Sequence, residues 1–268
     1  MSIVVAIDAG HGYNTAGKRC LKSIDPNQTR EWFLNDRIAD LVEQELRNKY
    51  NVIVLRTDDT TGAKDISLSS RVAAANNAKA ALFISIHHNA CIGGGSGGGT
   101  VVYYYSSLAA RAAQAKKLYD KLIARTDLRG NRSQPVQKNG FYVIKKTSMP
   151  AFLIENGFMD STTDTPIILT AEHARKTADA IVEFAAEQLS LKPETGQDKP
   201  QEQTKGCYPR CGAKYTTLAA ALTSVGVNST YAFRKKIAAA NSINGYCGTA
   251  AQNTRMLNLL KAGILKKA

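Results

Sequence analysis

Two of the four histidines in this chain stand where metal chemistry would need them. His11 lies just beyond a predicted strand over residues 3–8, and His87 ends a second predicted strand over 82–87. Glu155 directly follows a third, over 151–154. Two imidazoles with one carboxylate suit zinc and leave a fourth position open for water. These three residues are therefore the first candidates for a site.

The neighbouring histidine, His88, complicates this interpretation. Adjacent residues of a strand face opposite ways, so His87 and His88 do not easily join one site. The pattern alone leaves open which of them takes part. His173 lies in the polar start of a predicted helix, where we expect a surface residue.

Two glycine-rich runs superficially match other catalytic motifs. The run from Gly12 to Arg19 approaches a phosphate-binding loop, but Arg19 occupies the position where a hydroxyl must hold magnesium, and no helix follows directly. The run from Gly94 to Gly98 satisfies G-x-S-x-G around Ser96, but it leads into a strand instead of a helix. We therefore exclude nucleotide binding and a serine nucleophile at these places.

The elements that must position the candidates alternate between strand-like and helix-like runs. Short β-branched or aromatic segments predict strands over 3–8, 51–56, 82–87, 100–105, 141–144 and 151–154. Helical spacing predicts helices over 31–50, 67–79, 109–125 and 171–189. This alternation predicts an α/β fold with a mostly parallel twisted sheet flanked by helices. Ligands gather at the carboxyl ends of such strands, where the candidates stand.

A change in composition divides the chain into two modules. Residues 191–206 are rich in charged and amide side chains with prolines and glycines, which is typical of a linker. Domain 1–190 precedes it, and domain 207–268 follows with three short predicted helices near 217–225, 231–241 and 250–262. The second domain has nine basic residues and no acidic ones, within a chain of net charge +13. We expect a polyanionic partner: nucleic acid, an anionic membrane or an anionic cell wall.

The hydropathy pattern and the cysteines argue against membrane-spanning, exported and disulfide-rich proteins. No apolar run approaches the ~18 residues of a membrane span, so we expect no stable membrane insertion. Asp8 interrupts the first apolar run too early for a signal peptide, which predicts a protein that is cytoplasmic when made. Five scattered cysteines do not form a disulfide framework. Cys207 and Cys211 have C-x-x-x-C spacing but too few further ligands nearby for structural zinc.

Several motifs occur in an order that resembles a known family. They are Ile7-Asp-Ala-Gly-His11-Gly, Glu31-x-x-x-Asn35, Leu55-Arg-Thr-Asp58, Leu68-x-x-Arg71, Ala75-Asn76, Leu82-Phe-Ile-Ser-Ile-His87-His-Asn-Ala90 and Ala151-Phe-Leu-Ile-Glu155-Asn-Gly-Phe158. Together they resemble zinc-dependent N-acetylmuramoyl-L-alanine amidases of the amidase-3 type over residues 3–189. The enlarged loop after His11 and the glycine run over 93–99 depart from the family pattern and concern substrate preference.

The resemblance implies roles for individual residues. His11, Glu31 and His87 would hold the zinc ion, which selects His87 over His88, and Glu155 would be the catalytic carboxylate. From the residues alone, Glu31 is equally an acidic side chain placed at a helix N-terminus by the dipole. Three more residues have alternatives that stay open: Arg71 as an ion pair or a substrate contact, Asp8 as a partner of an imidazole or a turn former, and Asn89 as a substrate contact or a loop closure.

The C-terminal domain resembles cell-wall-binding modules of phage lysins over residues 231–263. The combined resemblance implies a peptidoglycan hydrolase that cleaves the amide between N-acetylmuramic acid and L-alanine. It implies an endolysin, made in the host cytoplasm and acting at the wall in cell lysis, with peptidoglycan and anionic wall polymers as partners and no nucleic acid. The alternatives are a bacterial autolysin, a wall-binding protein with an inert catalytic module, and another zinc hydrolase such as a peptidase or deacetylase.

Overall fold

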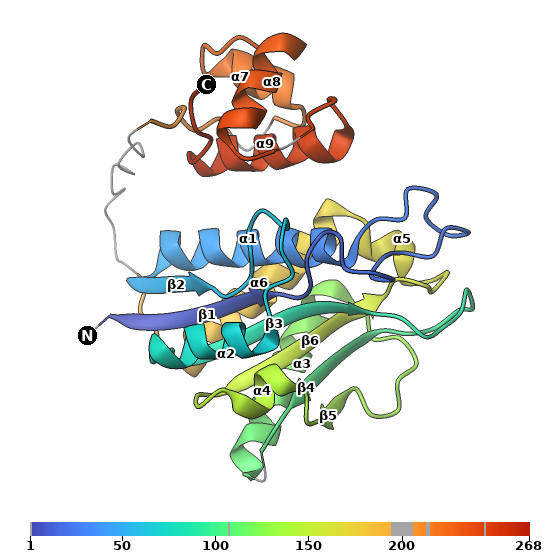
Figure 1. Cartoon of the computed structure of the whole chain (residues 1–268). Helices are drawn as coiled ribbons and strands as arrows, with labels where there is room; N and C mark the ends of the chain where they lie inside the picture. Colours follow the sequence, from blue (N-terminus) through green and yellow to red (C-terminus); the bar gives the residue numbers. More distant parts are fainter. Residues whose placement is uncertain (1, 107, 194–205, 213–214, 244) are drawn as a thin grey trace. The chain divides into compact units, whose positions relative to one another are not determined.

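The chain folds into two compact units, residues 1–194 and 195–268 (Figure 1). The structure, a computed structural model, describes residues 2–106, 108–193, 206–212, 215–243 and 245–268. Most of the linker predicted over 191–206 therefore lies outside the described residues, and each unit is described by itself.

The first unit is built on a six-stranded sheet with the order β2-β1-β3-β6-β4-β5. Its strands are β1 (Ile3–Ala9), β2 (Val52–Arg56), β3 (Leu82–Asn89), β4 (Thr100–Tyr104), β5 (Val136–Lys138) and β6 (Ala151–Phe158). Neighbouring strands run parallel except β4 and β6, which are antiparallel. The prediction of a mostly parallel α/β sheet is confirmed.

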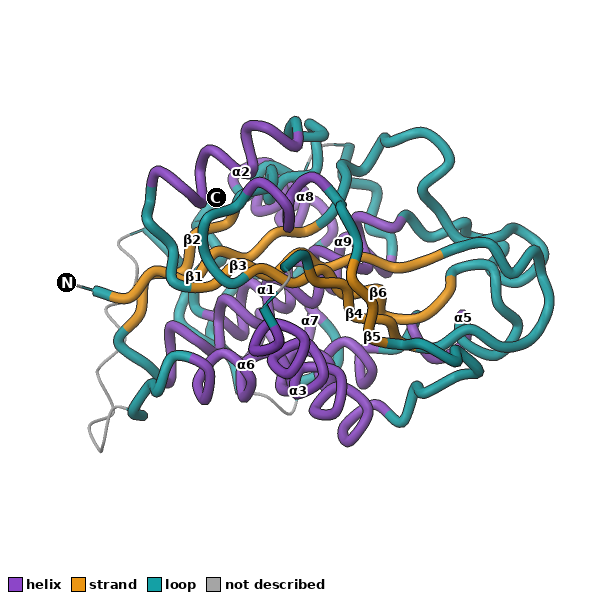
Figure 2. The backbone as a smooth tube through the Cα atoms, turned by 90° about the horizontal axis from the view of Figure 1, so that it is seen from below, coloured by secondary structure: helices purple, strands orange, loops and turns teal. Residues whose placement is uncertain are grey.

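Helices cover both faces of this sheet, and Figure 2 shows the strands as a layer between α2 on one side and α3 and α6 on the other. The helices of the unit are α1 (Glu31–Lys49), α2 (Leu68–Asn77), α3 (Ala109–Thr126), α4 (Tyr142–Lys146), α5 (Thr165–Ile168) and α6 (Ala171–Gln188). Side chains of α1, α3 and α6 pack into one core, and those of α2 and α4 into another.

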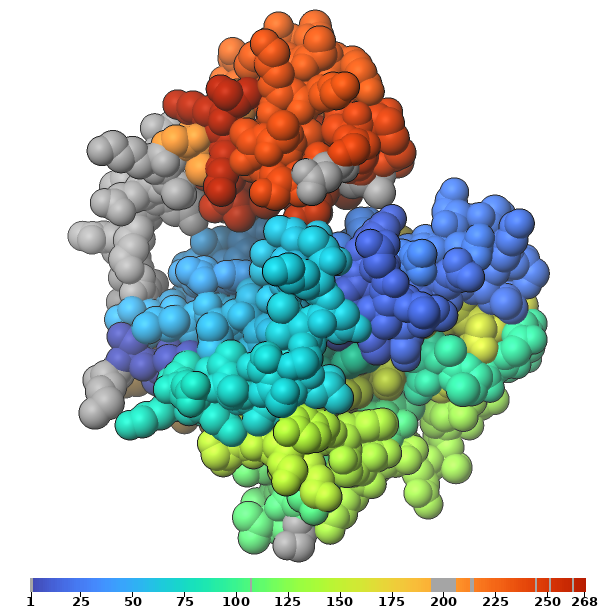
Figure 3. Space-filling view, in the orientation of Figure 1, coloured from blue at the N-terminus to red at the C-terminus, as the bar shows by residue number. Residues whose placement is uncertain are grey.

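Alternation along each strand distributes side chains between these two cores. On β3, Ile84 and Ile86 enter the core beneath α1 and α6, whereas Phe83 enters the core beneath α2 and α4. His87 therefore lies on the α2–α4 face and His88 on the α1–α6 face, because successive strand residues point to opposite sides. The short helices α2 and α4 pack against each other, as Figure 3 shows on the surface in cyan and yellow-green.

One predicted strand is wrong, and two short elements were not predicted. Residues 141–144 were expected to be a strand, but they lie largely in the helix α4. Their aromatic and β-branched side chains favour a strand locally, yet one helical turn buries Val143 and Ile144 together against α2. The missing edge strand is β5, which has three residues and too short a pattern to detect. The four-residue helix α5 is equally short.

Among its described residues, the second unit contains three helices with a core of their own, α7 (Leu218–Ser224), α8 (Tyr231–Ala240) and α9 (Ala250–Ala262). Leu222, Ile237, Met256 and Leu260 are fully buried between them. Thr249 begins α9 with a capping box, which satisfies backbone N–H groups at the helix start. Among the described residues, no helix is both long and apolar enough to cross a membrane.

Candidate metal centre

Three predicted side chains converge at the carboxyl end of the sheet. Glu31, the first residue of α1, places Oε1 3.3 Å from Nε2 of His11 and 3.1 Å from Nδ1 of His87. One ligand atom from each of the three residues lies within 4.8 Å of the others. The His11 and His87 rings meet edge to face at 5.0 Å. Segments far apart in the sequence thus form one cluster of two imidazoles and a carboxylate.

The donor set fits a tetrahedral zinc ion. Zinc–ligand bonds of about 2.0–2.1 Å place tetrahedral donors about 3.3 Å apart, close to the separations of Glu31 from both imidazoles. Among the described residues, the buried Oε2 of Glu31 has no hydrogen-bond partner. Its nearest cation is the ammonium of Lys18 at 3.7 Å, so a metal ion at ligand distance would recover more of the free energy that burial of this oxygen costs. The same residues therefore meet the geometric and the electrostatic requirement.

Glu31 is held in its ionised form by its neighbours. Burial raises its pKa, but hydrogen bonds and charge from His11 and His87 outweigh this, and the pKa is lowered overall. The N-terminus of α1 adds a favourable dipole for a negative charge. Glu31 therefore begins α1, as its helix-start role requires, and also faces both imidazoles, as a metal ligand would. The two interpretations of Glu31 are compatible.

His11 occupies an unusual backbone conformation. Its φ of 67° is in the left-handed region, which only a few per cent of residues other than glycine adopt. Arg71 stabilises this turn: Nη1 donates to the carbonyl of Ala9 at 2.7 Å, and Nη2 donates to the carbonyl of His11 at 3.0 Å. The guanidinium thus fixes the backbone on both sides of the turn that presents His11.

Asp8 is the buried counter-charge of Arg71. Its carboxylate accepts from Arg71 at 2.6 Å, from Thr57 at 2.8 Å and from Ser85 at 2.7 Å. No hydrogen bond from Asp8 to an imidazole is found among the described contacts. Of the two roles left open for Asp8, the structure shows the one that shapes the turn. The expectation of an ion pair at Arg71 is confirmed as well.

A close approach of backbone and ring explains the glycine before His11. A Cβ atom on Gly10 would lie 2.0 Å from Cε1 of His87. The imidazole of His87 therefore rests directly on the backbone of the β1 turn, and a side chain at residue 10 would displace it.

His88 and His173 belong to the other face of the sheet. His88 is buried and donates from Nδ1 to Oδ1 of Asn35 at 2.8 Å, while Nδ2 of Asn35 donates to the carbonyl of Gly10. His173 is 3% exposed, so the prediction of a surface position is wrong. It lies on the side of α6 that also carries the buried residues Ala174 and Thr177. The polar residues near it in the sequence made this buried side difficult to recognise.

Glu155 lies beside the three-residue cluster. In the register of β3 and β6, Glu155 is opposite His87, so both side chains are on the α2–α4 face. Its Oε2 is buried without a hydrogen-bond partner among the described residues. Burial raises the pKa of the Glu155 carboxyl to about 7, although the nearby His87 opposes the shift. A carboxyl group with such a pKa can accept and release a proton near neutral pH.

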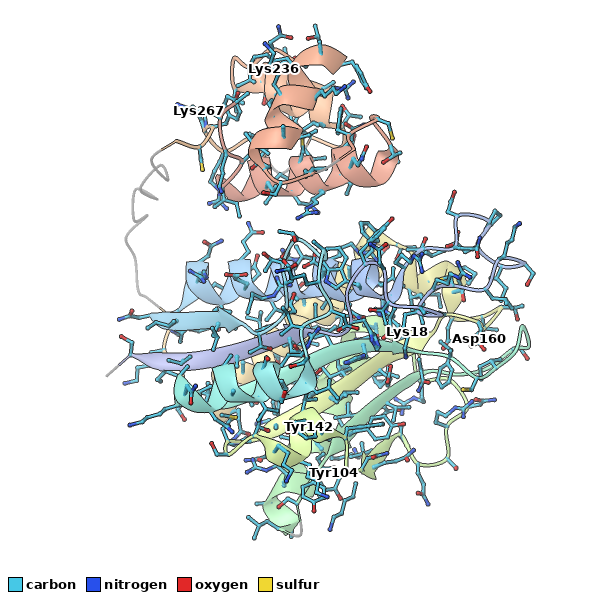
Figure 4. All side chains as sticks on the ribbon, in the orientation of Figure 1. Lys18, Tyr104, Tyr142, Asp160, Lys236 and Lys267 are labelled. Atoms are coloured by element: carbon cyan, nitrogen blue, oxygen red, sulfur yellow. The ribbon has the colours of Figure 1, made fainter. Side chains whose placement is uncertain are left out.

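Two residues of this region were not predicted. Asn35 stands one helical turn after Glu31 and joins His88 to the β1 turn; its place in the motif Glu31-x-x-x-Asn35 was the available signal. Lys18, in the loop before α1, places Nζ 3.7 Å from Oε2 of Glu31 (Figure 4). In the sequence it lies within the run from Gly12 to Arg19, which gave no indication of a role beside Glu31. Oδ1 of Asn89 accepts the backbone N–H of Ala90 at 2.8 Å, and both roles expected of Asn89 stay predictions.

The glycine-rich run after β3 is a firmly attached loop. Oδ2 of Asp160 (labelled in Figure 4) accepts the backbone N–H groups of Cys91, Ile92 and Gly93 at 2.7–2.8 Å. Asp164 accepts from Gly99 at 2.7 Å. The loop therefore forms a fixed wall next to the end of β6.

The five cysteines, Cys207 and Cys211 among them, are free.

Comparison with known proteins places this geometry in a family. Residues 5–187 match the model of the Amidase_3 family, described as N-acetylmuramoyl-L-alanine amidase. The endolysin of Bacillus phage SPP1 is 32% identical over 205 residues, which cover 76% of this chain and 73% of that protein. The N-acetylmuramoyl-L-alanine amidase CwlM of Bacillus licheniformis is 32% identical over 165 residues, which cover 60% of this chain and 59% of CwlM.

Solved structures agree with the sequence matches. The catalytic domain of CwlV, an N-acetylmuramoyl-L-alanine amidase from Bacillus (Paenibacillus) polymyxa var. colistinus, superposes with a TM-score of 0.62 at 29% identity and covers 71% of this chain and 99% of that domain. The matched region contains β1, β3, β6 and α1, which carry the cluster. The chain belongs to the Amidase_3 family of N-acetylmuramoyl-L-alanine amidases.

Proposed function

We propose that this protein hydrolyses the amide between the lactyl group of N-acetylmuramic acid and the L-alanine of the stem peptide, with a zinc ion held by His11, Glu31 and His87. The observation that carries this proposal is the convergence of these three donors at 3.1–3.3 Å from the shared carboxylate. Membership of the amidase family supports the choice of bond, and the nitrogen and oxygen donors support the choice of metal.

In this proposal, the metal and Glu155 have different roles in amide hydrolysis. Zinc, when bound, supplies a Lewis acid for the carbonyl and activates the attacking water. Glu155 takes the proton from that water as the carbon–oxygen bond forms. It then delivers the proton to the departing nitrogen as the carbon–nitrogen bond breaks, which releases a neutral amine. Its position opposite His87 in the strand register places it beside the proposed metal ligands.

An inert catalytic unit is the less favoured alternative. Such a protein would be expected to lack a ligand or the proton-transferring carboxylate, whereas this chain retains all four residues. Arg71 and Asp8 moreover support the left-handed turn at His11 with a fully buried ion pair. Backbone strain of this kind persists where the surrounding structure holds it in place, and it is commonly found at functional sites.

We propose that the second unit binds anionic polymers of the cell wall and that the protein acts as an endolysin in cell lysis. The absence of acidic residues from 207 to 268 supports attraction to teichoic acids or similar polyanions. Basic residues such as Lys236 and Lys267, labelled in Figure 4, carry this charge. Similarity to the SPP1 endolysin supports the lytic role. Wall binding by charge should weaken as salt is added.

Digestion of purified Gram-positive walls tests the catalytic proposal. New amino termini and new reducing sugars are measured in parallel, before and after chelation and again after zinc is restored. The proposal predicts new L-alanine termini without reducing ends, lost on chelation and recovered with zinc. Reducing ends without new amines would indicate a glycosidase. Acetate release, or termini inside the stem peptide, would identify a deacetylase or a peptidase on the same metal set.

A further inference from the structure

A polar cavity on the first unit lies outside the cluster described above. It has a volume of about 340 Å³, and every residue that lines it is polar: Asn131, Arg132, Ser133, Gln134 and Gln137. This volume is at the small end of ligand pockets, which are about 300–1,000 Å³. Nε2 of Gln137 donates to the carbonyl of Gln134 and Oδ1 of Asn131 accepts from Gly98, and the other polar atoms of the lining suit a ligand with many hydroxyl or amide groups.

The strand register connects this cavity to Glu155. Glu155 is opposite Val101, Tyr103 follows Val101 on the same face, and Tyr103 is opposite Gln137 of β5. Gln137 and Glu155 therefore share the α2–α4 face of the sheet. With strands about 4.8 Å apart and residues about 3.3 Å apart along a strand, their Cα atoms are separated by about 12 Å. One or two sugar rings would span this separation.

Aromatic side chains lie next to Gln137 on this face, because Tyr103 is opposite Gln137 in the strand register. Tyr103 and Phe141 meet edge to face at 5.0 Å, and Phe141 is 39% exposed. Tyr105, also exposed, continues this surface, with Nζ of Lys145 5.5 Å from its ring centroid. Exposed aromatic rings beside amide side chains match the two surfaces of a pyranose, whose C–H groups are apolar and whose rim is polar.

The charged member of the cavity is engaged by the protein. The guanidinium of Arg132 lies 4.7 Å from the ring centroid of Phe158, and its Nε donates to the carbonyl of Gly98 at 3.4 Å. These contacts attach the cavity wall to the end of β6 and to the glycine-rich loop. The other lining side chains are neutral, which favours a neutral sugar over the carboxylates of a stem peptide.

We infer that this cavity, with Tyr103 and Phe141, is a subsite for a sugar of the glycan strand next to the muramic acid whose amide is cleaved. The inference rests on the proposed function, because it places the glycan relative to Glu155. It predicts that the enzyme favours stem peptides carried on longer glycans over the isolated muramoyl peptide.

Kinetics of the zinc-loaded full chain on two soluble substrates test the subsite. One is a muramoyl peptide without further sugars, and the other carries the same peptide within a glycan of at least four sugars. Gln137→Ala and Phe141→Ala should each raise KM for the long substrate about fivefold, as the loss of about one hydrogen bond or contact implies, with kcat unchanged. Neither change should affect the short substrate.

Ile53→Ala is the matched control, because Ile53 is 52% exposed on β2 at the opposite edge of the sheet. It should leave both substrates unaffected. Unchanged KM in both cavity variants, or an equal rise for the short substrate, would overturn the subsite. A loss that follows the stem-peptide carboxylates instead of the number of sugars would overturn the choice of ligand.

A binding measurement separates this inference from the proposed function. Calorimetric titration with a peptide-free glycan of four sugars requires no catalysis. Weaker binding by the Gln137→Ala, Phe141→Ala double variant than by wild type supports the subsite even if no substrate is cleaved. Equal binding by the two proteins overturns the subsite, even if amide cleavage is found.

Discussion

His87 and His88 are neighbours on β3, yet the two faces of the sheet give them opposite surroundings. On the α2–α4 face, His87 forms a cluster with His11 and Glu31 and is opposite Glu155 in the strand register. On the α1–α6 face, His88 donates to the amide of Asn35 and is 2% exposed. The difference teaches that the partner distinguishes the two histidines: His87 faces a buried carboxylate, which suits the proposed metal site, whereas His88 faces a neutral amide, which suits a structural contact.

Exchange of each histidine in turn gives the largest expected contrast. His87→Ala should abolish metal binding and activity together, since it removes one of three ligands. His88→Gln should keep the metal and most of the activity but lower the free energy of unfolding by about 1–3 kcal/mol through the lost buried hydrogen bond. Metal content by mass spectrometry and chemical unfolding check both results. Loss of metal from the His88 variant would remove the distinction between the faces.

Glu155→Gln tests proton transfer separately from metal binding. The amide keeps the shape of the side chain but cannot accept the proton of water, so kcat should fall about 10²–10⁴-fold while the zinc content stays at one per chain. Wall digestion and metal analysis on the same sample measure both quantities. A rate within a few-fold of wild type would contradict the role of Glu155.

A further contrast compares two ion pairs of the first unit. Arg71→Met should lower the free energy of unfolding by about 3–5 kcal/mol, because it leaves the carboxylate of Asp8 buried without its counter-charge. Arg125→Met removes an exposed pair with Glu183 and should cost less than about 1 kcal/mol. Urea unfolding curves compare the two. Similar losses in both variants would show that the network beneath His11 adds little rigidity.

His173 gives the α1–α6 face a pH dependence of its own. Burial lowers the pKa of His173 to about 4, below the value of 6.5 in an unfolded chain. Between pH 6.5 and 4 the unfolded chain binds a proton that the folded chain does not. Stability therefore falls as the pH falls through this range, by up to about 3 kcal/mol from this residue.

As the pH falls from 6.5 to 4, the free energy of unfolding of the His173→Gln variant should decrease less than that of wild type. Above pH 7, the free energies of unfolding of both proteins should depend on pH in the same way. Unfolding free energies measured across this range in both proteins give the comparison. Parallel curves would mean that His173 is not buried in a neutral form.

Sequence patterns predicted most helices and strands, but they said less about which face of a helix or of the sheet each side chain occupies. The long helices and central strands have clear periodicity, and the motifs around His11, His87 and Glu155 identified the residues that the fold brings together. The network of Asp8 and Arg71 joins residues 63 positions apart, which no local pattern reveals. The burial of His173 depends on how α6 rests on the sheet, and the cavity near Gln137 depends on a strand of three residues.

The most direct test is a zinc titration of the full chain followed by nitrogen-15 NMR of its four histidine rings. The account predicts that one equivalent of zinc shifts the ring signals of His11 and His87, each identified by substitution, and leaves those of His88 and His173 nearly unchanged. Shifts at His88 or His173 comparable to those at His11 and His87, or no response at His11 and His87, would contradict the assignment of the metal centre.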